Sequence, residues 1–110
     1  MFGLIFMSCS TQSDAIRYPQ ILEDGKAKHC LELQDLELQG DCLSSFIKKD
    51  PLNHDISELC LKLSSQKWQS ECFFQLSDEG EHIGESAILL CSQSGEFEED
   101  CLRHAGARQV

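Results

Sequence analysis

The chain has 110 residues, which is enough for one small domain and too few for two ordinary ones. Nineteen acidic residues stand against nine basic ones, so the formal net charge is -10, and no Lys or Arg lies between Lys67 and Arg103. This balance excludes a basic surface of the kind that binds nucleic acid or anionic lipid headgroups. Only two Pro, one Asn and one Thr are present, while Leu, Glu, Gln, Lys and Ala favour helix, so an all-α fold is expected rather than a β-sandwich or barrel.

The N-terminus begins with an apolar run, M-F-G-L-I-F-M, that is too short to span a bilayer. The run ends at Ser8-Cys9, which resembles the lipobox of bacterial lipoproteins, where a small residue precedes a cysteine that is acylated and becomes the mature N-terminus. The resemblance implies lipid attachment at Cys9 after a residual signal-like segment at 1–8. We expect a polar linker at 9–19, and a helical repeat domain at 20–110 that rests on the cysteine repeat described next. The alternative is an apolar tail on a soluble protein.

The other six cysteines define an internal repeat. They form three successive pairs, in which the first members are 30 and 31 residues apart and the second members 30 and 29. In each pair a large apolar residue precedes the second cysteine by four positions, an acid stands directly before it and a large apolar residue directly after it. The pairs are Cys30 with Cys42, Cys60 with Cys72, and Cys91 with Cys101, and the large apolar residues before them are Leu38, Trp68 and Phe97.

A period near 30 residues with a helix-forming composition predicts three stacked αα-hairpins. In the second copy, two apolar stripes with helical spacing each carry one cysteine. The stripes are Ile56, Leu59, Cys60 and Leu63, then Trp68, Cys72 and Leu76. Asn53 or Asp55 can cap the first helix, and a turn is expected at residues 64–66. Since two packed helices bring facing cysteines within disulfide range, we predict one bond within each copy.

Seven cysteines in so short a chain indicate an oxidising compartment. Short helices are marginal alone, and a bridge that closes a loop of about 13 residues contributes roughly 3 kcal/mol, so the bonds are expected to be structural. We expect Gly40 to interrupt the second helix of the first copy. Trp68 is expected to pack between the middle hairpin and its neighbours, and the segment G-E-H-I-G at 80–84 to lead into the third hairpin.

The repeat resembles the cysteine-paired helical repeats of secreted and envelope-anchored bacterial and archaeal proteins, most of which are uncharacterised. Leu59-Cys60, Trp68 and Glu71-Cys72-Phe73 carry the match in the second copy. Phe97, Asp100-Cys101 and His104 match the variant that closes such arrays. The resemblance covers residues 28–107 and implies the fold and the compartment, but no activity.

Motifs for catalysis and metal binding are weak. No C-x2-C of a zinc site, no nucleophile motif and no phosphate-binding glycine loop is present. His29 beside Cys30, and Cys101 with His104, are the only spacings compatible with metal ligands, and oxidised cysteines explain them better. The acidic run at 96–100 lacks the pattern of an EF-hand loop and is expected to form the first turn of a helix.

These features together predict a non-enzymatic, extracytoplasmic helical-repeat module without a cofactor or resident metal. We expect it to be held in the cell envelope through lipid on Cys9, or else secreted, and to contact another protein or an envelope component. A second hypothesis is a metal-binding or enzymatic protein that uses His82, His104 and the acids between Asp78 and Asp100. A third is a fragment of a longer repeat array.

Overall fold

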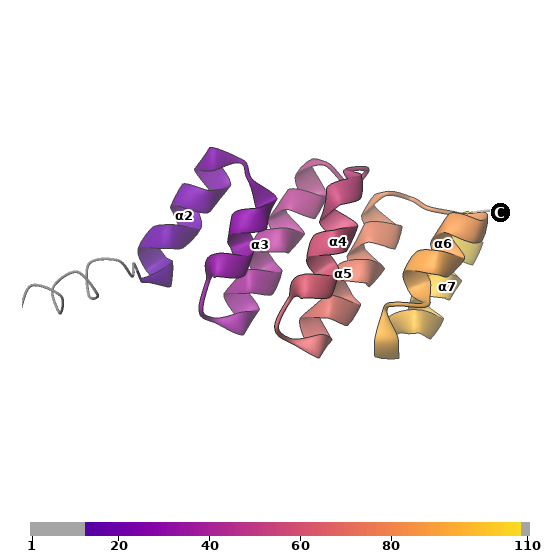
Figure 1. Ribbon diagram of the computed structural model, residues 1–110. Coiled ribbons are helices and arrows are strands. Elements are labelled where there is room, and N and C mark those ends of the chain that lie inside the picture. The colour runs from indigo at the N-terminus through magenta and orange to yellow at the C-terminus, as the bar shows by residue number, and fades with distance from the viewer. Residues whose placement is uncertain (1–12, 109–110) are drawn as a thin grey trace, which may run out of the picture.

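The computed structural model describes residues 13–108, and this part of the chain contains helices joined by short turns, without a β-strand. Their order along the chain is shown in Figure 1. The helices are α2 (Asp14–Asp24), η1 (Ala27–Glu32), α3 (Leu36–Lys49), α4 (His54–Lys62), α5 (Gln66–Glu79), α6 (Gly84–Cys91), η2 (Gly95–Phe97) and α7 (Glu98–Arg108), where η denotes a 3-10 helix. Within residues 13–108, no helix is both long enough and apolar enough to cross a bilayer.

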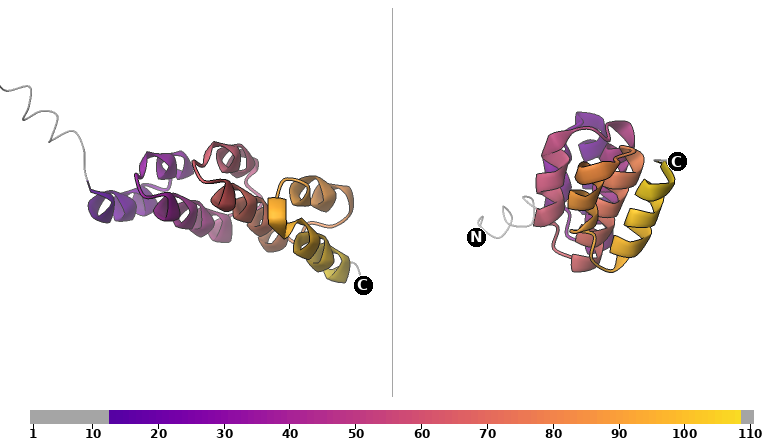
Figure 2. Two further views of the ribbon diagram at one scale, coloured as in Figure 1. Left: turned by 90° about the horizontal axis from the view of Figure 1, so that it is seen from below. Right: turned by 90° about the vertical axis from the view of Figure 1, so that its right-hand side faces the viewer.

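The helices stack in two layers, as the left view of Figure 2 shows. Three hairpins, η1 with α3, α4 with α5, and α6 with α7, follow one another along the stack. The second helices α3, α5 and α7 pack side by side in one layer, with α2 beside α3 at its N-terminal end, while η1, α4 and α6 form the other layer. The expected all-α architecture of three stacked hairpins is therefore confirmed. The first element of the first hairpin is a six-residue 3-10 helix, whereas the other two hairpins begin with α-helices.

One disulfide joins the two helices of each hairpin, as the cysteine spacing predicts. The bonds are Cys30–Cys42, Cys60–Cys72 and Cys91–Cys101, with Cα–Cα distances of 5.6, 5.7 and 5.5 Å. All six cysteines are buried. Structural disulfides persist in oxidising compartments, so these three bonds indicate an oxidising, extracytoplasmic environment.

Two glutamines at equivalent repeat positions close the first two hairpins. The side chain of Gln39 donates to the carbonyl oxygens of Leu31 and Leu33 at 3.2 and 2.8 Å. Thirty residues later, Gln69 donates to the carbonyl oxygens of Leu61 and Leu63 at 3.2 and 2.7 Å. Carbonyl groups at the end of a helix lack partners within that helix, so each glutamine satisfies two acceptors that the turn would otherwise leave open. The sequence analysis did not identify either residue.

The N-caps of three helices are also side chains from the preceding turns. Asp35 accepts hydrogen bonds from the amides of Glu37 and Leu38 at the start of α3. Asn53, rather than Asp55, caps α4, and Ser65 caps α5. The turn between α4 and α5 thus falls at residues 63–65, close to the expected position.

Gly40 lies inside α3 and does not interrupt it, contrary to expectation. Its position is buried against the indole of Trp68 on α5, because a Cβ atom added at Gly40 would lie only 2.1 Å from Cδ2 of that ring. The glycine therefore allows α3 and α5 to approach closely, and this benefit outweighs its low helix propensity. Trp68 is half-buried and packs on the preceding hairpin as well as on its own.

The helical part of the chain begins at Asp14, six residues before the expected start of the repeat domain at residue 20. Residues 9–19 were expected to form a polar linker, but α2 takes up the second half of this segment and includes Pro19. Contacts to the first hairpin hold this helix. Asp14 accepts from the amides of Gln34 and Asp35 at 3.1 and 2.8 Å, and the Tyr18 hydroxyl donates to Asp41 at 2.5 Å.

Candidate interaction groove between α4 and α6

The third hairpin stacks on the second differently from the way the second stacks on the first. Helix α4 packs against η1, whereas α6 packs against α5 and α7. Within residues 13–108, α4 and α6 share at most a marginal contact. The layer of first helices is therefore open between α4 and α6, while the layer of second helices continues.

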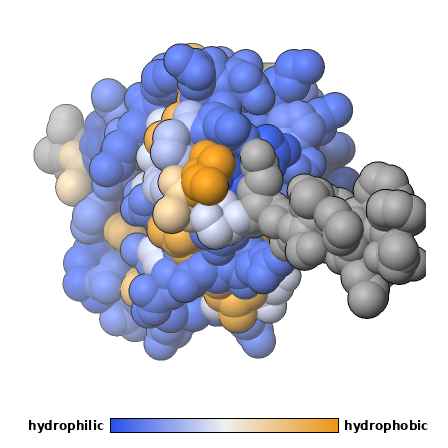
Figure 3. Space-filling model, turned by 90° about the vertical axis from the view of Figure 1, so that its left-hand side faces the viewer, coloured by the Kyte–Doolittle hydropathy of each residue, from blue (hydrophilic) through white to orange (hydrophobic). Residues whose placement is uncertain are grey.

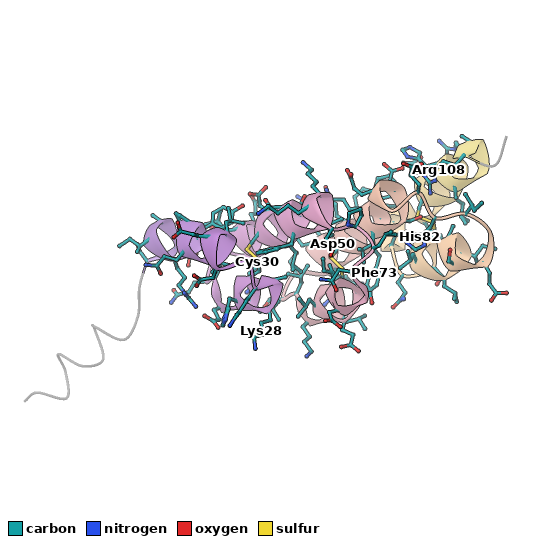
Figure 4. The ribbon with its side chains drawn as sticks, turned by 90° about the horizontal axis from the view of Figure 1, so that it is seen from above. Lys28, Cys30, Asp50, Phe73, His82 and Arg108 are labelled. Atoms are coloured by element: carbon teal, nitrogen blue, oxygen red, sulfur yellow. A yellow bond between two sulfur atoms is a disulfide. The ribbon has the colours of Figure 1, made fainter. Side chains whose placement is uncertain are left out.

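An arginine at the end of α7 holds the connection from α5 to α6. The guanidinium of Arg108 donates to the backbone oxygen of His82 at 2.6 Å, to that of Ser77 at 3.1 Å and to the carboxylate of Asp78 at 3.0 Å. Glu81, in the same connection, has a φ of 51°, which is rare for a residue with a side chain. Figure 4 shows Arg108 and His82 at the same end of the stack. These contacts fix the connection against α7 and so help to keep α6 away from α4.

The space between α4 and α6 forms a cavity of about 430 Å³. Its wall is mostly apolar, and its few polar groups come from residues that precede or begin the two helices. Leu76 of α5 is buried, whereas Leu52 and Leu89 on the two sides are exposed by 65% and 61%. The lining residues are Pro51, Leu52, Asn53, Ser57, Leu76, His82, Ser86, Leu89 and Leu90. The cavity is thus an open groove that presents aliphatic side chains to solvent.

Helix α6 has more apolar surface than its packing can bury. Ala87 and Cys91 face the core, and yet Ile88 and Leu89 are exposed by 58% and 61%. Helical geometry places Leu89 on the groove side with Ser86, while Ile88 does not line the groove. The run A-I-L-L at 87–90 was the sequence signal for this surface, because a hairpin helix needs only one apolar stripe. The sequence analysis did not identify Leu52 or Leu89.

The chain segments that line the groove are strongly acidic. Residues 50–61 and 76–93 together contain seven Asp and Glu and no Lys or Arg. Asp78 is paired with Arg108 and His104. Within residues 13–108, the other six carboxylates form no ion pair. Lys48, Lys49 and Lys62 flank the first of these segments, so residues 48–62 and 76–93 together carry seven acids and three lysines. The groove is therefore an apolar surface formed by segments of net negative charge.

The alternative metal or enzymatic site is brought together only in part. Asp78 contacts His104, whereas the ring of His82 contacts Ser86. Nδ1 of His104 is 3.0 Å from Asp78, whose same oxygen accepts from Arg108. The ring of His82 instead contacts the Ser86 hydroxyl at 3.1 Å. Within residues 13–108, His, Cys, Asp and Glu form no group of three that could hold a metal ion.

The remaining candidate ligands have other partners. Nδ1 of His29 lies 2.6 Å from Glu32, and the neighbouring Cys30 is in a disulfide. Of the acidic run at 96–100, Glu98, Glu99 and Asp100 form the first turn of α7, as expected, whereas Glu96 and Phe97 lie in η2. Glu99 and Asp100 both pair with Arg103. Cys9, the expected site of lipid attachment, lies outside the residues that the structure describes.

A second apolar spot lies on the N-terminal face of the molecule. Figure 3 shows a small hydrophobic patch there among hydrophilic residues. Ile16 on α2 is 54% exposed. The groove between α4 and α6 differs from this patch because all of its lining lies within the described part of the chain.

Comparison with known proteins returned no similar family, curated protein or solved structure.

Proposed function

We propose that the protein is a non-enzymatic, extracytoplasmic interaction module that binds another protein or an envelope component in the groove between α4 and α6. The observation that supports this proposal is the exposed aliphatic lining of the groove, in which Leu52 and Leu89 flank a cavity of about 430 Å³. A soluble surface rarely keeps such a concave apolar site without a use for it. The buried disulfides support the same proposal, because they stiffen the hairpins that carry the lining.

We also propose that lipid on Cys9 tethers the module to a membrane. Helix α2 begins at Asp14, five residues after Cys9, so an extended tether would span at most about 17 Å. Lipid attachment would therefore hold α2 close to the membrane surface. It would also occupy the one cysteine that the three hairpin bonds do not use.

In-host photocrosslinking tests the proposed binding groove. We would replace Leu89 by p-benzoylphenylalanine in the full chain and irradiate intact cells of the native host. Ile88 is the matched control, because it is on the same helix, is almost as exposed and does not line the cavity. We expect a discrete covalent adduct from position 89 and much less from position 88. Equal labelling from both positions, or no adduct from position 89, would contradict the proposed role of the groove.

Membrane fractionation tests the tether separately. We expect the wild-type chain in the membrane fraction and Cys9→Ser in the soluble or unprocessed fraction. Recovery of the wild-type chain as a soluble protein that retains an unmodified Met1 would contradict lipid attachment but leave the groove proposal standing.

A further inference from the structure

We infer that the partner presents a basic peptide segment to this groove and inserts one or two bulky aliphatic or aromatic side chains between Leu52 and Leu89. The inference deepens the proposed function and rests on it. Three features of the groove carry the argument: its size, its chemistry and the charge of the segments that form it.

The size and chemistry of the groove suit apolar side chains. A cavity of about 430 Å³ lies toward the lower end of the range for ligand pockets, about 300 to 1,000 Å³. The wall offers leucines from three different elements, α5, α6 and the turn before α4. The polar groups, from Asn53, Ser57, His82 and Ser86, are too few to recognise a polar ligand along its whole length. The groove therefore anchors an apolar group rather than a sugar or a nucleotide.

The charge around the groove favours particular residues on either side of the partner's apolar side chain. Six of the seven carboxylates on residues 50–61 and 76–93 form no ion pair in the described part of the chain. Glu85 lies one helical turn before Leu89, so its carboxylate is on the same side of α6 as the groove. A partner with Lys or Arg beside its apolar anchor gains from this field, whereas an acidic partner is repelled.

The same charge argues against the other occupants of an apolar groove. A second copy of the chain would bring the same carboxylates and a net charge of -10 to the contact. An anionic lipid headgroup would likewise meet like charge. A basic peptide with an apolar anchor is the occupant that suits both the apolar wall and the net negative charge of the segments that form it.

Selection from a displayed library of random 12-residue peptides tests this inference on the full oxidised chain. The double variant Leu52→Ser/Leu89→Ser serves for counter-selection, and it is expected to fold because both leucines are exposed. We expect the enriched peptides to share an aliphatic or aromatic residue with Lys or Arg on either side. Enrichment of acidic or uncharged sequences would overturn the charge argument, and failure to enrich any groove-dependent peptide would overturn the inference as a whole.

Fluorescence polarisation with the best selected peptide then separates the two contributions. We expect Leu89→Ser to weaken binding at least about tenfold, and Ile88→Ser to leave it within about twofold. Glu85→Gln should weaken binding at low salt and have a smaller effect at high salt. Equal losses from Leu89→Ser and Ile88→Ser would mean that the peptide binds elsewhere and would overturn the inference. A crosslink from position 89 in the host, without basic peptides in the selection, would refute this partner class alone and leave the proposed function intact.

Discussion

Gly40 is the position where a single methyl group should change the stability of the stack most clearly. In Gly40→Ala the new Cβ would lie 2.1, 2.2 and 2.6 Å from Cδ2, Cε3 and Cγ of Trp68, where normal contacts are about 3.5 to 4.0 Å. Cγ is bonded directly to Cβ of the tryptophan, so a rotation of the ring cannot fully relieve the clash, and α3 must move away from α5. Overpacking of this kind costs about 1 to 3 kcal/mol, and the higher helix propensity of Ala returns up to about 1 kcal/mol. We expect a net loss of about 1 to 2 kcal/mol.

Urea unfolding followed by far-ultraviolet circular dichroism, with the disulfides intact, measures this loss. Gly106→Ala is the matched control, because Gly106 also lies in a helix and has no atom within 4 Å of an added Cβ. It should be neutral or slightly stabilising. In the Trp68→Ala background, Gly40→Ala should also become neutral or stabilising, which would give a coupling energy of at least about 1 kcal/mol. If Gly40→Ala stabilises the wild-type chain as Gly106→Ala does, the packing argument is wrong.

Two further predictions concern charged contacts at the two ends of the stack. Hydrogen bonds lower the pKa of Glu32, and the bond from Arg17 has a larger effect than the bond from His29. The ionised carboxylate therefore stabilises the fold at pH values above its unfolded-state pKa. This contribution is lost as the pH falls through the lower folded-state pKa. Glu32→Gln should therefore be less stable than the wild type at pH 7, and the difference should shrink as the pH falls below about 4.5. Urea unfolding over a pH series measures this difference in stability. A difference that grows in acid would contradict the stabilising role of the Glu32 carboxylate. Arg108→Gln should raise the rate of amide hydrogen exchange in residues 80–86 and leave α2 unchanged; unaltered exchange in 80–86 would show that Arg108 does not hold this connection.

The cysteine spacing predicted the hairpins and their covalent bonds for a physical reason. A disulfide requires Cα atoms within a few Å, and two helices joined by a short turn meet this requirement at fixed distances from the turn. Cys60 lies three residues before Leu63, at the start of the turn, and Cys72 lies nine residues after it. Both are on the buried stripes that period and hydropathy indicated. Covalent geometry and helical periodicity are both local properties, so a single sequence is enough to reveal them.

The contacts between hairpins were not predictable in the same way. Gly40 is a poor helix former, and only the approach of Trp68 from the next hairpin explains its place inside α3. Asp14 and Tyr18 likewise acquire their roles from residues 20 or more positions away in the chain. Gln39 and Gln69 differ, because they bond within their own hairpins and their spacing of 30 residues matches that of the cysteine repeat. A polar residue that recurs with a structural period carries information about turns, even when apolar residues dominate the pattern.

The groove arises where the third hairpin departs from the repeat. Trp68 of the second hairpin packs on Gly40 of α3, but Ser70 occupies the equivalent position on α5, and Phe97, the counterpart of Trp68, stacks instead on Phe74 at 5.9 Å. Phe74 lies four residues beyond Ser70, so the ring contact has moved by about one helical turn, or 6 Å, along the supporting helix. The third hairpin is therefore shifted along α5 together with Phe97. The cysteines of the third hairpin are also 10 residues apart instead of 12, so this copy is shorter as well as differently anchored. Helix α6 is carried with its hairpin while α4 keeps the register of the first two hairpins, so the layer opens at this junction between Leu52 and Leu89.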